Sequence, residues 1–322
     1  MSDHRGLFEH AKGSTPREEH GYCVDDNARL LVVSSREGDH GSTHRLSRLA
    51  LAFVLGAQSR DGTTRNRMDR NGRWTDESGT DDCWGRSLWG LGHAATHHSD
   101  PTIRQRALGG FDNGVRQRSP WPRAMAFAAL GAADVLSDEP DHAPARALLI
   151  DAVASIGPLP RGPWQWPEPR LTYANAALAE ALIAAGAALS NPVVLDRGLT
   201  MLTWLFNLET PNGHLSPTGV GGRGPGNCAP IFDQQPIEAA AMADACWRAF
   251  TVTGDRAWWR GVEVAARWFA GENDTGLPMY DDVSGGGFDG LQPEGVNVNQ
   301  GAESTLALVS TTQRARSFAP SP

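Results

Sequence analysis

Residues 25–33 read DDNARLLVV and residues 81–92 read DDCWGRSLWGLG. In both stretches two adjacent aspartates precede small and apolar residues that have the spacing of a helix. Negative charge is favourable at the N-terminus of a helix, because the aligned peptide dipoles leave a partial positive charge there. A single carboxylate is enough to cap a helix. The doubled aspartates therefore predict buried helices whose first turns also carry a function, with simple helix capping as the alternative.

Four further stretches share this character, a polar or aromatic start followed by a body of small apolar residues. They are PWPRAMAFAALGAA (120–133), LTYANAALAEAL (171–182), DQQPIEAAAMADA (233–245) and NQGAESTLALV (299–309). The six starts recur at intervals of roughly 40–65 residues, a period typical of stacked helix pairs. The polar chemistry gathers at one end of one helix in each pair. A ring in which the six polar starts meet at one rim explains this pattern better than an open solenoid does.

Helical periodicity extends over most of the chain, in segments rich in alanine, leucine and arginine, and no stretch shows sustained strand-type alternation. The sequence therefore predicts an all-α protein, an (α/α)6 toroid of helical hairpins. We expect one domain over residues 1–322, with residues 1–23 as an N-terminal loop segment at the cavity rim. A closed ring has twelve helices and the pattern predicts about eleven, so the ring is either incomplete or sealed by residues 1–20. The predicted segments are 24–37, 42–58, 83–98, 101–117, 121–137, 142–156, 171–189, 192–208, 235–252, 255–271 and 299–315.

The composition indicates a globular protein: 40% of the 322 residues are apolar and 20% are charged. The formal net charge of -8 argues against nucleic acid and anionic membranes as main partners. The four cysteines lie far apart and form no C-x-x-C pair, so a zinc ribbon is not expected. The sequence shows neither a leader nor an apolar run long enough to span a bilayer, which makes the cytoplasm the expected location. We expect neither a cofactor nor a bound metal.

Two motifs carry a resemblance to a known family. GLFEHAKGSTPREEHGYCVDDNAR at 6–29 and NQGAEST at 299–305 resemble the six-hairpin glycosidase superfamily. Within it the chain is most similar to an uncharacterised bacterial glycosidase-like domain that is often fused to, or encoded near, glycosyltransferases. The resemblance covers nearly the whole chain. It implies the six-hairpin toroid, an oligosaccharide or polysaccharide substrate, and a glycosyltransferase encoded nearby as a candidate partner.

Glycoside hydrolysis requires two carboxyl groups across the scissile bond. Glu238 and Glu303 each lie three residues after a glutamine, one turn inside a helix. Partial desolvation there would raise the pKa of a carboxyl group and suit a general acid, although these two side chains could instead be struts between helices. We expect an inverting hydrolase with Glu303 as one catalytic group and Glu238 or Asp82 as the other. The catalytic candidates are Glu303, Glu238, Asp82 and Asp26.

The candidates for substrate binding are rim side chains that can stack on a sugar ring or hydrogen-bond its hydroxyl groups. For Trp164 and Trp166 the alternative is that they pin their loop on the core. The full set is His20, Tyr22, Asp25, Arg29, Asp81, Trp84, Arg86, Trp121, Arg123, Trp164, Trp166, Tyr173, Asn175, Asp233, Gln234, Gln235, Asn299 and Gln300.

Other functions fit part of this pattern. A non-catalytic sugar-binding domain would use the same rim without turnover. Sugar epimerases and isomerases on the same toroid use histidines for proton transfer, but no histidine opens a predicted inner helix after position 20. His93, His97 and His98 fall late in their helix, away from the predicted rim. A zinc site made of Cys23, Asp25 and a histidine is a remoter alternative.

Overall fold

The computed structural model describes residues 1–37 and 41–317. The chain forms two compact units. Unit 1 comprises residues 1–11, 15–156 and 187–191, and unit 2 comprises residues 12–14, 157–186 and the chain from 192 onward. The single domain that we expect from the sequence stays a prediction.

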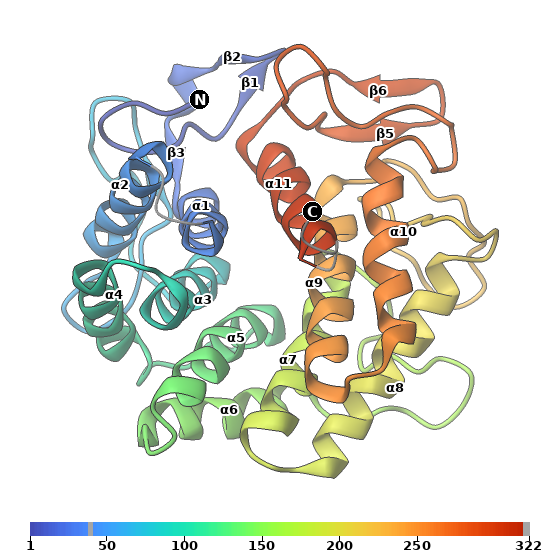
Figure 1. Cartoon of the computed structure of the whole chain (residues 1–322), viewed down its shortest axis with the longest axis horizontal. Coiled ribbons are helices and arrows are strands. Elements are labelled where there is room, and N and C mark those ends of the chain that lie inside the picture. The colour runs from blue at the N-terminus through green and yellow to red at the C-terminus, as the bar shows by residue number, and fades with distance from the viewer. Residues whose placement is uncertain (38–40, 318–322) are drawn as a thin grey trace. The chain divides into compact units, whose positions relative to one another are not determined.

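Unit 1 is built from three consecutive helical hairpins (Figure 1). In each hairpin the first helix packs on the second, and the three first helices also pack on one another in chain order. This gives an inner row of α1, α3 and α5, backed by α2, α4 and α6. The six helices are α1 (Val24–Arg36), α2 (Gly41–Ala57), α3 (Asp82–His97), α4 (Pro101–Gly114), α5 (Pro122–Asp138) and α6 (Ala143–Ile156).

The backbones of α3 and α5 touch through glycines. A Cβ atom at Gly131 would lie 2.1 Å from the carbonyl oxygen of Leu88. A Cβ atom at Gly85 would lie 2.2 Å from the carbonyl oxygen of Ala124, and one at Gly92 would lie 2.4 Å from that of Gly131. Distances this short leave no room for a side chain. Glycine is therefore required at three positions along the α3–α5 contact, which we call the glycine seam.

Unit 2 contains the remaining helices of the described part of the chain. α9 packs against both α10 and α11. α7 and α8 approach closely where Gly198 meets Ile183, because a Cβ atom at Gly198 would lie 2.8 Å from that side chain. The five helices are α7 (Asn175–Ala188), α8 (Pro192–Glu209), α9 (Pro236–Thr253), α10 (Trp259–Phe269) and α11 (Ala302–Arg316), with a short 3-10 turn at Arg256–Trp258 before α10.

The helices with small apolar bodies are buried on nearly all sides. In α5 every residue from Arg123 to Leu136 is buried, and in α7 every residue from Asn175 to Gly186 is buried. A helix that is apolar all round has to be enclosed by other elements. α4 and α6 are instead buried along one stripe, as expected for helices on the outer side of a unit. Helices whose sequences are almost entirely small and apolar are therefore buried on all sides, whereas α4 and α6 are exposed on one side.

All eleven predicted helices are present in the described residues, and the all-α class is confirmed. The only strands there are two or three residues long. β3 pairs antiparallel with β4, and β5 with β6. None of the helices described is long and apolar enough to cross a membrane. The strands are β1 (Ala11–Lys12), β2 (Thr15–Pro16), β3 (Tyr22–Cys23), β4 (Arg67–Met68), β5 (Gly290–Gln292) and β6 (Gly295–Asn297).

Candidate active site

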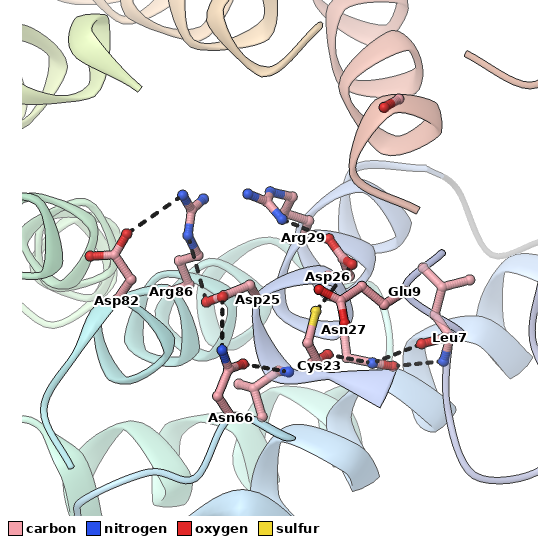
Figure 2. Close-up of polar contacts among 12 residues, drawn as sticks. Leu7, Glu9, Cys23, Asp25, Asp26, Asn27, Arg29, Asn66, Asp82 and Arg86 are labelled. Atoms are coloured by element: carbon pink, nitrogen blue, oxygen red, sulfur yellow. Dashed lines mark hydrogen bonds and ion pairs between the residues drawn. The ribbon is translucent and has the colours of Figure 1, made fainter. Parts of the chain in front are cut away.

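The first motif of the sequence builds a buried ion pair at the start of α1. Figure 2 shows Asp26 between Cys23 and Arg29. Asp26 Oδ1 accepts a hydrogen bond from Arg29 Nη1 at 2.7 Å, and the Cys23 thiol donates to Asp26 Oδ2 at 3.1 Å. Asp26 is 2% exposed and Arg29 is 7% exposed. A buried charge is tolerated when it is paired and hydrogen-bonded, so each of these two side chains depends on the other.

Cys23 is not available as a metal ligand or nucleophile. Burial, together with the nearby carboxylates of Asp26 and Asp25, raises the pKa of the Cys23 thiol well above its usual value. The thiolate is the form that binds metals and attacks electrophiles. The zinc site considered from Cys23 and Asp25 is therefore not supported by the chemistry of this corner.

Asp25 has different partners from Asp26. Its Oδ2 accepts from Asn66 Nδ2 at 3.2 Å, while Oδ1 lies 3.7 Å from Arg86 Nε (Figure 2). Arg86 Nη2 in turn lies 3.9 Å from Asp82 Oδ2, and the Arg86 guanidinium sits 4.0 Å from the ring centre of Phe127. Two carboxylates from α1 and α3 thus flank one buried arginine. One aspartate of each doubled pair, Asp25 and Asp82, therefore lies beside Arg86.

The N-terminal segment is fastened to α1 by a buried amide. Asn27, which is fully buried, accepts a hydrogen bond from the Leu7 backbone N–H at 3.0 Å and donates to the carbonyl oxygen of Cys23 at 2.8 Å. Asn66 accepts from the Val24 backbone N–H at the first turn of α1. These two amides hold residues 1–11 and the loop around residue 66 beside the aspartates. Sequence reasoning missed both of them.

Trp121 is an exposed aromatic residue with a fixed orientation. Its indole Nε1–H donates to Asp81 Oδ1 at 3.0 Å, which joins the residue preceding α5 to the residue preceding α3. Trp121 is 57% exposed, so a ring face is open to a ligand. Arg123, two residues further along, is buried. Unit 1 therefore brings together three of the six predicted polar starts.

In unit 2, Glu238 binds the start of α7. Its carboxylate accepts from the Ala174 backbone N–H at 2.5 Å and from the Asn175 backbone N–H and Nδ2 at 3.2 Å each. The first N–H groups of a helix have no partner within the helix and need one from elsewhere. Glu238 is 4% exposed. It therefore acts as the strut that the sequence left open as an alternative.

The start of α11 is held by an aspartate that sequence reasoning missed. Asp289 Oδ1 accepts from the Gly301 backbone N–H and from the Ser304 hydroxyl, both at 2.7 Å. The predicted residue Gln300 is buried and donates to Asp281 Oδ2 at 3.1 Å. Glu303 lies in the first turn of α11 and is half-buried.

The Asn299 side chain is bound to the N-terminal hairpin. Its Oδ1 accepts from the Gly13 backbone N–H at 3.1 Å, and the Gln300 backbone N–H donates to the Gly13 carbonyl oxygen at 3.0 Å. Both predicted polar residues before α11 therefore help to position backbone. Their amide groups are committed to contacts within unit 2.

Asp233, three residues before α9, is a carboxyl group with one oxygen that lacks a hydrogen-bond partner among the described residues. Its Oδ2 accepts from Gln292 Nε2 at 3.2 Å, while Oδ1 is buried and has no hydrogen-bond partner among residues 1–37 and 41–317. Burial raises the pKa of Asp233, and the charge of Asp289 adds to the rise. A Cβ atom at Gly290 would lie 2.4 Å from Asp233 Oδ1, so only glycine leaves room for this carboxyl group.

The two adjacent glutamines before α9, Gln234 and Gln235, differ in burial. Gln234 is fully buried, donates to Asp274 Oδ2 at 2.6 Å and accepts from the Trp268 indole at 3.3 Å. Asp274 also binds His214 Nε2 at 2.9 Å through its other oxygen. Gln235 is half-buried and immediately precedes α9. This Asp274–His214 contact joins two long loops and was not predicted.

Several predicted sugar-binding residues do not fit that role. Trp84 and Trp166 are fully buried and Tyr22 is 1% exposed, so none of the three presents a ring face to a ligand. Tyr22 donates its hydroxyl to Asp3. Trp166 stacks on Trp204, as the alternative of a loop pinned on the core requires.

The remaining aromatic and imidazole candidates vary in exposure. Trp164 is half-buried and contacts Trp204 edge to face at 4.9 Å. Tyr173 is 41% exposed, just before α7. His20 is exposed and contacts His10 at a ring-centre distance of 5.0 Å. Tyr173 and Trp121 are therefore the most exposed of the predicted aromatic residues.

A buried glutamate at the end of α8 also escaped sequence reasoning. Glu209, at the end of α8, is 2% exposed. Its Oε1 accepts from the Thr218 backbone N–H at 2.8 Å and from the Thr218 hydroxyl at 2.7 Å. Burial raises the pKa of Glu209 to about 7, although these hydrogen bonds and Arg223 act in the opposite direction.

Comparison with solved structures identifies the fold. A sugar epimerase from a ruminal bacterium matches with a TM-score of 0.72 at 10% identity, over 99% of this chain and 94% of that chain. The cellobiose 2-epimerase from Spirochaeta thermophila gives a TM-score of 0.66 at 12% identity, over 98% of this chain and 91% of that one. An endoglucanase of glycoside hydrolase family 9 gives 0.65 at 13% identity, over 96% of this chain and 74% of that one.

No protein-family model and no curated protein sequence matches the chain. At these identities the likeness to solved structures shows the fold alone. It confirms the class predicted from the sequence, an all-α fold of the (α/α)6 toroid type. The narrower resemblance, to a bacterial branch encoded near glycosyltransferases, stays a prediction.

Proposed function

We propose that this protein is a carbohydrate-active enzyme, an inverting glycoside hydrolase acting on an oligosaccharide or polysaccharide. The observation that carries the proposal is Asp233, with its raised pKa and its unpartnered buried oxygen at the start of α9. A carboxyl group whose pKa is raised holds its proton to higher pH, which suits a general acid. A carboxyl group whose pKa is raised by burial and by a nearby charge is a candidate for function on physical grounds.

In this proposal Asp233 replaces Glu238 as the general acid. Both oxygens of Glu238 accept hydrogen bonds from the start of α7, which commits that side chain to holding the helix. Glu303, the first choice from the sequence for one of the two catalytic groups, is the general base in this proposal. Asp233 would protonate the leaving oxygen while the Glu303 carboxylate takes a proton from the attacking water, and the anomeric configuration inverts.

The test is hydrolysis of an oligosaccharide panel by the wild type and by Asp233→Asn and Glu303→Gln. Both variants keep the side-chain shape and remove the titrating group, so turnover should fall by about 10²–10⁴-fold, the typical contribution of general acid–base catalysis. Glu272→Gln, at an exposed surface carboxylate, is the matched control and should retain turnover.

The product anomer, followed by NMR directly after mixing, tests the stereochemistry. Retention of configuration would overturn the inverting mechanism. Near-normal turnover of Asp233→Asn would overturn the assignment of the acid. Saturable sugar binding without turnover by the wild type would show a binding domain instead.

A sugar epimerase or isomerase is the second candidate, and one observation favours it. His214 is oriented by Asp274, which also binds Gln234 two residues before α9. An imidazole held by a carboxylate is suited to proton transfer. The same panel, analysed for epimerised or isomerised products rather than cleaved ones, distinguishes the two activities. His214→Asn should abolish epimerisation and leave hydrolysis unchanged.

A further inference from the structure

Two histidines and an aspartate meet near the C-terminal end of α3, outside the set of residues proposed for catalysis and sugar binding. His93 Nδ1 lies 2.8 Å from Asp134 Oδ2 of α5, and both side chains are buried. The imidazole of His97, one turn further along α3, stacks on that of His93 with ring centres 4.2 Å apart and planes inclined by 18°. His97 is exposed. One nitrogen or oxygen atom of each of the three residues lies within 4.8 Å of the others.

The hydrogen bonds of the two rings fix which nitrogen carries the lone pair. His93 Nδ1 faces the carboxylate of Asp134, and His97 Nδ1 lies 3.2 Å from the His93 carbonyl oxygen. Both of these partners accept hydrogen bonds, so each Nδ1 carries the proton and each Nε2 keeps its lone pair. His93 Nε2 is buried and has no hydrogen-bond partner within residues 1–37 and 41–317.

A buried acceptor without a partner is unfavourable, and native structures usually supply one. We propose that the Nε2 atoms of His93 and His97 bind a borderline divalent transition-metal ion such as Zn²⁺, with Asp134 orienting the His93 ring. This departs from the expectation of a protein without metal. An imidazole whose other ring nitrogen donates to a carboxylate is the common arrangement of a metal-binding histidine.

The preference for this class of ion follows from the donors. Imidazole nitrogen suits zinc, copper and nickel, whereas calcium and magnesium take oxygen ligands. Zinc–nitrogen distances are about 2.0–2.1 Å. The two imidazole rings stack with nearly parallel planes, so they have to turn toward each other to direct both Nε2 lone pairs at one ion. The remaining coordination positions fall to water, because His97 is exposed and opens the site to solvent.

The charges near the site act in opposite directions. Burial lowers the pKa of His93 to about 3 even though Asp134 acts to raise it, so the ring is neutral at neutral pH. Arg36 and His97 are the other groups whose charges reduce the proton affinity of His93. The positive charge of Arg36 also disfavours a bound cation, whereas Asp134 favours it. Arg36→Gln should therefore strengthen metal binding.

The experiment is titration of the full metal-free chain with Co²⁺, followed by visible absorption, and with Zn²⁺ in competition. One equivalent should bind saturably. His97→Ala changes an exposed side chain and should weaken binding at least tenfold without unfolding the protein. Asp134→Ala removes the group that orients His93 and should weaken binding by about 10–100-fold, the typical effect of an outer-shell partner.

His10→Ala is the matched control, because His10 and His20 form another close histidine pair. It should leave the affinity unchanged, and Zn²⁺ should raise the melting temperature of this control but not that of His97→Ala. Absence of saturable one-to-one binding would overturn the proposal. Equal affinity of the wild type and His97→Ala would overturn it as well. Because the readouts are binding and melting, they are independent of the proposed glycoside hydrolysis.

Discussion

The two adjacent aspartates at the start of α1 should respond very differently to removal. Asp26→Ala removes the carboxylate that accepts a hydrogen bond from Arg29 at 2.7 Å, and Arg29 is itself only 7% exposed. Breaking a buried ion pair by removing one member costs about 3–5 kcal/mol, chiefly because the remaining charge is uncompensated. Asp25 has 22% of its side chain exposed and has longer contacts, 3.2 Å to Asn66 and 3.7 Å to Arg86. Its removal should cost about 1–2 kcal/mol.

The difference of about 2 kcal/mol or more can be measured by urea unfolding followed by circular dichroism. The double variant Asp26→Ala/Arg29→Met removes both charges and fills part of the space with an apolar chain. It should recover much of the loss, since replacing a whole buried pair by apolar groups is often nearly neutral. Two outcomes contradict this reasoning. One is an equal loss for Asp25→Ala and Asp26→Ala, and the other is a double variant no more stable than Asp26→Ala alone.

Three further substitutions test separate features of the structure. Glu209→Gln should flatten the pH dependence of stability. The raised pKa means that the folded protein holds a proton on Glu209 that the unfolded chain releases. The wild-type free energy of unfolding therefore falls as the pH rises from 4.5 to about 7. Parallel pH profiles of the two proteins in urea titrations would contradict this. Glu238→Gln places an amide NH2 group against backbone N–H groups and should lower the free energy of unfolding by about 1–3 kcal/mol, which a thermal melt would detect. An unchanged melting temperature would rule out the role of Glu238 as a strut. Gly131→Ala should lower the free energy of unfolding by about 1–3 kcal/mol or more through overpacking. Gly109→Ala on α4, where the added methyl group would meet open space, should be neutral or stabilising. Similar effects of the two substitutions would refute the glycine seam.

The helices could be predicted because their signal is local. Runs of alanine and leucine mark the buried helices, and all eleven predicted segments are helical over most of their length. The errors fall at the starts. The segments predicted from 171 and 299 begin at Asn175 and Ala302. Those starts are set by Glu238 and Asp289, which bind the first turns from other parts of the chain. A contact between residues far apart in sequence produces no periodic pattern from which it could be predicted.

Local contacts could be found from the sequence for the site residues as well, whereas contacts between distant residues were missed. Asp26 and Arg29 were both candidates from the sequence, and their contact is local because residues three apart on a helix are neighbours. Asn66, Asp274 and Asp289 lie in loops, where their partners depend on how the loop folds back. The opposite error affected Trp84, whose place beside polar residues in the sequence suggested a sugar platform although its ring is fully buried.

The glycine seam limits how the spacing between the starts of α3 and α5 in unit 1 can change. Most helix pairs are separated by a layer of side chains, and substitution in that layer shifts one helix against the other. Where the main chains of α3 and α5 touch, no such layer exists, so the distance between Asp81 and Trp121 at their starts is set by the backbones themselves. The surrounding core can therefore accumulate substitutions while this spacing stays constant. A change in the spacing would require a new contact between the helices, and gradual adjustment of residue sizes could not produce it.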